Sequence, residues 1–162
     1  SCSTQQVPDL KDKFKKYDIF ASLDVQEVYG EENIENALRL SVNTFESTVL
    51  INNKSYYDYK ALPNYAQFSS VNDIIIEDFD DDEINDILLV GNMYHAEIET
   101  TGNDSGNGLL LKGNGDGNFK EIPISKSGFF TPGDSKKIIS LKRNKDKLFI
   151  VANNDDRLQI FK

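Results

Sequence analysis

The segment that organises this chain is Glu77-Asp78-Phe79-Asp80-Asp81-Asp82-Glu83-Ile84-Asn85-Asp86, which leads directly into the apolar run Ile87-Leu88-Leu89-Val90. Seven of the ten residues in the first stretch carry carboxylates. Carboxylates held about 5 Å apart repel each other by roughly 1–3 kcal/mol per pair at the effective dielectric of a protein surface. A loop that fixes so many of them therefore needs a counter-ion.

Four aspartates alternate along this acidic loop, so that their side chains can converge on one cation. They stand at loop positions 1, 3, 5 and 9, and they are Asp78, Asp80, Asp82 and Asp86. The backbone carbonyl of Ile84, at position 7, is a further expected ligand. Because a ligand set made only of oxygen atoms favours calcium, the sequence predicts a Ca²⁺ site here.

The acidic loop departs from the EF-hand pattern in two ways. An EF-hand needs a bidentate glutamate at position 12, where this chain has Leu89 inside an expected strand. Position 6 is normally glycine because the backbone there is left-handed, and this chain has Glu83 instead. The alternative to a calcium site is therefore a degenerate acidic turn that is empty at ordinary calcium concentrations.

Composition narrows the class of protein. The 162 residues suffice for one domain, or for two to three copies of a smaller unit, and no apolar run reaches the roughly 18–20 residues of a membrane span. A net charge of −9 without a basic stripe argues against nucleic-acid binding and favours neutral or cationic partners. With Cys2 as the only cysteine, an internal disulfide is excluded.

The first forty residues divide into a tether and a helical segment. In the tether of residues 1–8, residues 3–6 are all polar, and the beginning of the chain around Cys2 resembles the end of a bacterial lipoprotein signal, in which the cysteine is acylated. The alternative is a thiol without a role. Residues 9–40 show helical periodicity, with Ser22 as the expected N-cap of a second helix, and we expect them to cover the sheets that follow.

From residue 41 onward the pattern changes to short apolar runs separated by Asn, Gly and Asp, which predicts strands and turns. The expected strands are residues 43–51, 56–61, 73–77, 87–90, 108–112, 119–124, 136–142, 147–152 and 157–162. Residues 41–162 are therefore predicted to form a mainly β domain behind the helical segment. The unbroken apolar run that ends at Val90 is typical of a strand covered on both faces.

The β domain also contains an internal repeat. Residues 86–92 align with residues 147–153 at an offset of 61 positions, and residues 48–53 align with residues 108–113 at an offset of 60. A unit of about 60 residues and four strands is close to one propeller blade. We therefore predict an incomplete, open β-propeller-like stack of about two to three four-stranded antiparallel blades, in which the complete blade spans residues 71–124.

Several of these segments resemble a known repeat. The acidic loop with Gly91-Asn92, the run Gly108-Leu-Leu-Leu and the turn Gly113-Asn-Gly-Asp-Gly-Asn-Phe119 are similar to the FG-GAP or VCBS repeat, the calcium-loop blade of integrin-type β-propellers. Further segments are similar to the C-terminal region of cartilage-acidic-protein-like (ASPIC/UnbV-associated) proteins of bacterial cell surfaces. Those segments are Leu62-Pro63, Ala66-Gln-Phe-Ser69, Gly128-Phe129 and Pro132-Gly-Asp134.

The resemblance implies a calcium-dependent extracellular scaffold or binding protein without established catalysis, with a protein or glycan as its partner. It implies a bacterial cell-surface location, outer-membrane or periplasmic, with the lipid on Cys2 as the membrane anchor. The run of preceding blades typical of the family is absent from this sequence. A second hypothesis is therefore a purely structural fragment that self-associates through open blade edges or completes its blades with another chain.

A third hypothesis, the least favoured, is a hydrolase. His95 is the only histidine, and Glu97 or Asp104 could act with it as acid and base. The chain has neither a GxSxG motif nor a second histidine for a zinc site, so we expect a protein that is not an enzyme. The long loop of residues 92–107 is the expected site of ligand contact, since long loops on rigid scaffolds carry binding.

Overall fold

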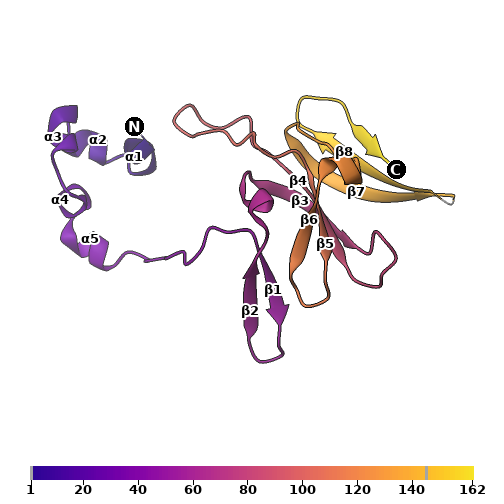
Figure 1. Cartoon of the computed structure of the whole chain (residues 1–162). Coiled ribbons are helices and arrows are strands. Elements are labelled where there is room, and N and C mark those ends of the chain that lie inside the picture. The colour runs from indigo at the N-terminus through magenta and orange to yellow at the C-terminus, as the bar shows by residue number, and fades with distance from the viewer. Residues whose placement is uncertain (1, 145) are drawn as a thin grey trace. The chain divides into compact units, whose positions relative to one another are not determined.

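The structure, a computed structural model, describes residues 2–144 and 146–162 (Figure 1). The chain divides after Asn43 into two compact units, a helical one and a β one. Five short helices make up the first unit: α1 Cys2–Gln6, α2 Leu10–Lys13, α3 Tyr17–Ala21, α4 Val25–Tyr29 and α5 Glu31–Glu35. That these helices cover the sheets stays a prediction.

The helical unit is built of single turns tied together locally. The predicted start of the second helix at Ser22 is wrong, because Ser22 ends α3 and the N-cap of α4 is Asp24. The Asp24 carboxylate accepts a hydrogen bond from the backbone N–H of Glu27 at 2.8 Å, and the Glu27 carboxylate accepts one from the Asp24 N–H at 2.9 Å. This reciprocal capping box explains why the helix begins there.

The β unit contains three antiparallel sheets. A hairpin is formed by β1 Thr48–Asn52 and β2 Tyr57–Ala61. A four-stranded sheet has the order β3 Val71–Glu77, β4 Asp86–Gly91, β5 Leu109–Gly113 and β6 Phe119–Ile122. A three-stranded sheet has the order β7 Ser135–Arg143, β8 Asp146–Asn153 and β9 Gln159–Phe161.

The prediction of a mainly β domain with antiparallel sheets is confirmed, and each of the nine expected strands is present. Two short helical turns were not predicted, namely the 3₁₀ turn η1 Asn64–Gln67 and the helix α6 Ile124–Ser127. Neighbouring strands follow one another in sequence in every sheet, so each sheet is a simple meander. The described residues close neither a barrel nor a propeller.

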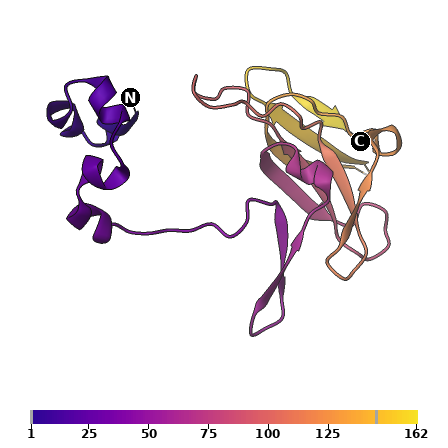
Figure 2. The same ribbon diagram turned by 60° about the vertical axis from the view of Figure 1, so that its left-hand side comes forward.

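Strand β4 lies at the centre of the β unit, and every residue of it is buried. Ile87 and Leu89 pack with residues of β5, η1 and the β1–β2 hairpin on one face of the four-stranded sheet. Leu88 and Val90 pack on the other face against residues of β7 and β8. The four-stranded sheet is thus covered on both faces, as its unbroken apolar run predicted (Figures 1 and 2).

The two outer sheets each leave one apolar face exposed. On the three-stranded sheet, Ile139, Ile150 and Ile160 lie in register across β7, β8 and β9, and the exposed fractions of Ile139 and Ile160 are 47% and 63%. On the hairpin, Leu50 and Tyr59 form a cross-strand pair that is also exposed. Exposed apolar faces of this kind are typical of surfaces that pack against another sheet.

Candidate functional site

The acidic loop connects β3 to β4, within the four-stranded sheet. Asp78, Asp80 and Asp86 each contribute one carboxylate oxygen to a group in which the three atoms lie within 4.8 Å of one another. Two ligands of one calcium ion are at most about 5 Å apart, since each lies about 2.3–2.6 Å from the ion. The structure therefore brings together three of the four predicted carboxylates at a separation that fits a shared Ca²⁺.

The same carboxylates hold the loop backbone in place. The Asp78 carboxylate accepts hydrogen bonds from the N–H groups of Asp80 and Asp82 at 3.2 Å and of Glu83 at 2.7 Å. The buried Asp86 carboxylate accepts one bond from the Phe79 N–H at 3.1 Å and one from the Gly113 N–H at 2.8 Å. Asp86 thus ties the loop to β5, and each of its oxygens keeps a lone pair for a cation.

Asp82 lies outside the three-carboxylate group. One of its oxygens accepts a hydrogen bond from the Ile84 N–H at 2.9 Å, and the other pairs with the Lys112 ammonium at 2.6 Å. Lys112 also pairs with Asp80. These contacts lower the pKa of Asp82 and raise the pKa of Lys112. The assignment of Asp82 and of the Ile84 carbonyl as metal ligands stays a prediction.

Lys112 was not singled out in the sequence. It belongs to β5, far from the loop in the chain, and only the sheet order places it beside the aspartates. Its ammonium supplies part of the positive charge that the loop requires. A signal was nevertheless present, because Lys112 is the one charged residue in the apolar run that follows Gly108.

Position 6 of the loop has the left-handed backbone for which glycine is normally used, although the residue here is Glu83. Glu83 has a φ of +66° and Asp81 has a φ of +60°, so both residues are left-handed. A side chain in this conformation costs roughly 1–2 kcal/mol, which glycine would avoid. The loop keeps the required shape despite the glutamate, because the Glu83 N–H is held by Asp78.

His95 has different partners from those the sequence suggested. Its Nδ1 atom lies 3.7 Å from a carboxylate oxygen of Asp134 and 3.3 Å from the Asn154 amide nitrogen. The Asp134 carboxylate is buried, and its other oxygen pairs with the Lys136 ammonium at 2.5 Å. The expected pairing of His95 with Glu97 or Asp104 is therefore replaced by contacts to residues distant in the chain.

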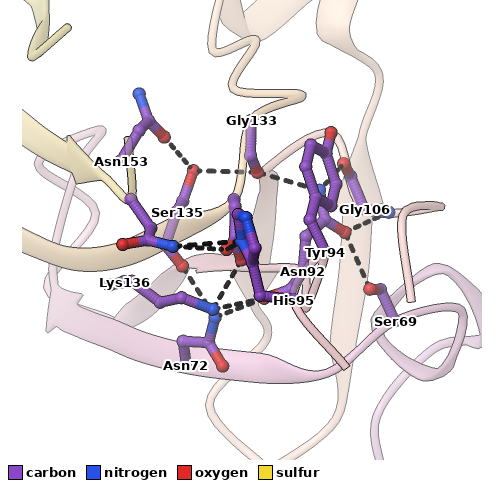
Figure 3. A network of polar contacts seen from close by, with 12 residues as sticks. Ser69, Asn72, Asn92, Tyr94, His95, Gly106, Gly133, Ser135, Lys136 and Asn153 are labelled. Carbon is purple, nitrogen blue, oxygen red and sulfur yellow. Dashed lines mark hydrogen bonds and ion pairs between the residues drawn. The ribbon is translucent and has the colours of Figure 1, made fainter. Parts of the chain in front are cut away.

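A buried asparagine, Asn92, organises the loops at the end of β4 that lies opposite the acidic loop (Figure 3). Its Nδ2 atom donates hydrogen bonds to the carbonyls of Gly106 at 2.8 Å, Gly133 at 2.9 Å and Pro132 at 3.1 Å. Its Oδ1 atom accepts bonds from the Ser69 hydroxyl at 2.7 Å and the Gly106 N–H at 2.8 Å. One side chain thus fixes both ends of the loop of residues 92–107.

The sequence motif contained Asn92, but its role as a loop anchor was missed. The repeat offset of 61 positions relates it to Asn153, at the end of β8. Asn153 accepts a hydrogen bond from the Ser135 hydroxyl at 2.7 Å, as Asn92 does from Ser69, and donates one to the Arg157 carbonyl at 3.1 Å. The coincidence of two asparagines at one repeat position was the signal that could have identified the role.

Comparisons with family models, with curated proteins and with solved structures find no match to this chain. Among the described residues, no helix has the length and apolarity needed to cross a bilayer. The features of this chain that bear on function are the acidic loop, the Asn92 network and the exposed surfaces.

Proposed function

We propose that this protein is a non-enzymatic, calcium-stabilised binding module of the FG-GAP or VCBS type, whose stacked sheets are propeller-type blades. The observation that carries the proposal is the group of three carboxylate oxygens within 4.8 Å at the β3–β4 connection. Its position between the first two strands of a four-stranded meander is the one that the repeat requires. The proposed location is the bacterial cell surface, with a lipid on Cys2 as the anchor and a protein or glycan as the partner.

The proposed ion has a structural role. Asp78, Asp80 and Asp86 would hold it, joined by the predicted ligands Asp82 and the Ile84 carbonyl. When bound, the ion supplies the positive charge that the clustered carboxylates lack. Asp78 and Asp86 position the loop backbone themselves, through hydrogen bonds from loop N–H groups and from Gly113. Ion binding therefore stabilises an existing loop shape and links β3, β4 and β5.

Calcium titration by isothermal calorimetry tests this proposal. The informative variant is Asp80→Asn, because Asp80 belongs to the carboxylate group, is exposed, and its carboxylate pairs with Lys112 rather than with the loop backbone. The matched control is Asp81→Asn, which removes the same charge from a neighbouring residue outside the group. We expect the wild type and the control to bind one Ca²⁺ and Asp80→Asn to bind it at least tenfold more weakly. Equal affinities in all three proteins would contradict the assignment.

A second candidate function, a structural fragment that packs against another chain, is favoured by the row of Ile139, Ile150 and Ile160, in which Ile139 and Ile160 are exposed and Ile150 is half-buried. An apolar sheet face of this kind is normally covered, as both faces of the four-stranded sheet are in this chain. Light scattering across a range of concentrations tests this candidate. Association that Ile160→Lys abolishes would support it, and a strict monomer would contradict it.

A further inference from the structure

A pocket of about 290 Å³ opens beside the four-stranded sheet, where the loop of residues 92–107 enters β5. Its size is close to the lower end of the roughly 300–1,000 Å³ range of ligand pockets. Leu109 and Ile124 supply apolar walls, and the backbone from Gly106 to Gly108 forms one side. Tyr65 and Glu121 supply an aromatic ring and a carboxylate. Every one of these residues lies in the β unit.

The backbone side of the pocket is fixed by the core behind it. A side chain on Gly108 would place its Cβ atom 2.7 Å from the Phe129 ring, and one on Gly106 would place it 2.6 Å from the Asn92 Oδ1 atom. Gly106 is further held because Asn92 bonds both its N–H and its carbonyl. The pocket wall therefore exists before any ligand arrives, which lowers the entropic cost of binding.

The charged and aromatic groups of the pocket indicate the ligand. Among the described residues, no hydrogen bond or ion pair engages the Glu121 carboxylate, which is half-buried at the pocket. The Tyr65 ring packs against the Phe68 ring with 5.1 Å between their centroids, and the residue is still 59% exposed, so part of the ring remains open to a cation. A net charge of −9 further raises the local concentration of cations around the protein.

We propose that this pocket binds the side chain of a lysine presented by a partner protein. The alkyl stem of lysine matches the apolar walls of Leu109 and Ile124, and its ammonium matches Glu121 and the Tyr65 ring. This inference rests on the proposed role as a binding module and names the chemistry of its partner. It does not depend on the acidic loop, whose residues are not part of the pocket.

The test uses the full chain and a peptide probe, acetyl-Gly-Lys-Gly-amide, followed by amide chemical shifts in NMR spectra. The comparison peptide carries norleucine, which keeps the alkyl stem and lacks the ammonium. We expect lysine-dependent shifts at Gly106, Gly108 and Ile122. We also expect an affinity about tenfold lower for the norleucine peptide and for the Glu121→Gln variant, the size of one charge-assisted hydrogen bond. Glu31→Gln, the same charge change in α5, is the matched control and should bind as the wild type does.

Several results would overturn the inference. They are equal affinity of wild type and Glu121→Gln for the lysine peptide, equal affinity for the two peptides, and the absence of binding at millimolar peptide. Binding of n-butylamine without binding of the peptide would overturn the protein partner as the source of the ammonium. Repeating the titration with calcium and with chelator separates the two proposals. Peptide-dependent shifts at the pocket together with acidic-loop amides that do not respond to calcium would refute only the metal site. Calcium-dependent shifts in the acidic loop without peptide-dependent shifts at the pocket would refute only the pocket.

Discussion

Removing the Asn92 side chain is the sharpest perturbation of the β unit. The side chain is fully buried and makes five hydrogen bonds, to the carbonyls of Gly106, Pro132 and Gly133 and from Ser69 and the Gly106 N–H. Each buried group left unsatisfied costs about 1–3 kcal/mol, although some partners find new contacts as the loops relax. We expect Asn92→Ala to lower the free energy of unfolding by about 3–5 kcal/mol. This is a large share of the total free energy of unfolding of a typical domain, which is roughly 5–15 kcal/mol.

A second variant separates hydrogen bonding from backbone strain at the same position. Asn92 has a φ of +87°, a conformation in which alanine is strained by roughly 1–2 kcal/mol and glycine is not. Asn92→Gly should therefore be the less destabilised variant, by about that amount, while losing the same hydrogen bonds. Urea denaturation measures both, with Asn114→Ala, in an exposed turn, as the control. The role of Asn92 as a loop anchor is refuted if the free energy of unfolding of Asn92→Gly lies within about 1 kcal/mol of the wild-type value.

Further variants test the other parts of the account. Burial opposes ionisation of Asp134, but Lys136 and Asn154 outweigh it and hold the pKa of Asp134 below 3.8. This carboxylate therefore contributes stability above about pH 4 that is lost as the pH falls through the lowered pKa. Asp134→Asn should flatten the acid side of the stability curve, measured by denaturation between pH 2 and pH 6, and an unchanged curve would contradict this. Gly91→Ala would place a Cβ atom 1.7 Å from the Ser70 carbonyl oxygen and should cost about 3 kcal/mol or more. Gly128 has a φ of +68°, and a Cβ atom there would meet no atom within 4 Å, so Gly128→Ala should lower the free energy of unfolding only by the backbone strain of about 1–2 kcal/mol. Equal losses of stability in the two glycine variants would argue against the close approach at Gly91.

The strands and the acidic loop could be predicted because their signals are local. The run from Ile87 to Val90 is apolar at every position, which indicates burial on both faces, and the structure confirms it. The loop before it carries alternating aspartates, and three of them converge as expected. The 61-residue offset placed β4 and β8 at matching positions, and both strands are central in their sheets.

Contacts between distant segments could not be predicted in the same way. Lys112 reaches the acidic loop only because β5 pairs with β4, and His95 faces Asp134 only because the loops after β4 and before β7 are adjacent. The helix start at Asp24 was misassigned to Ser22, since both residue types cap helices and only the bond from Glu27 decides between them. Side-chain choices of this kind depend on partners that single-segment patterns do not contain.

A thermal melt with calcium and with chelator tests the central claim most directly. A ligand present at 100 times its Kd stabilises the folded state by about 2.7 kcal/mol, which raises the Tm of a chain of this length by roughly 5–10 °C. We predict that shift for the wild type and for Asp81→Asn. In Asp80→Asn, tenfold weaker binding leaves about 1.4 kcal/mol at the same calcium concentration, so we predict a shift of about half that size or less. A wild-type melt that is identical in calcium and in chelator would contradict the account, because the acidic loop would then be balanced by Lys112 alone.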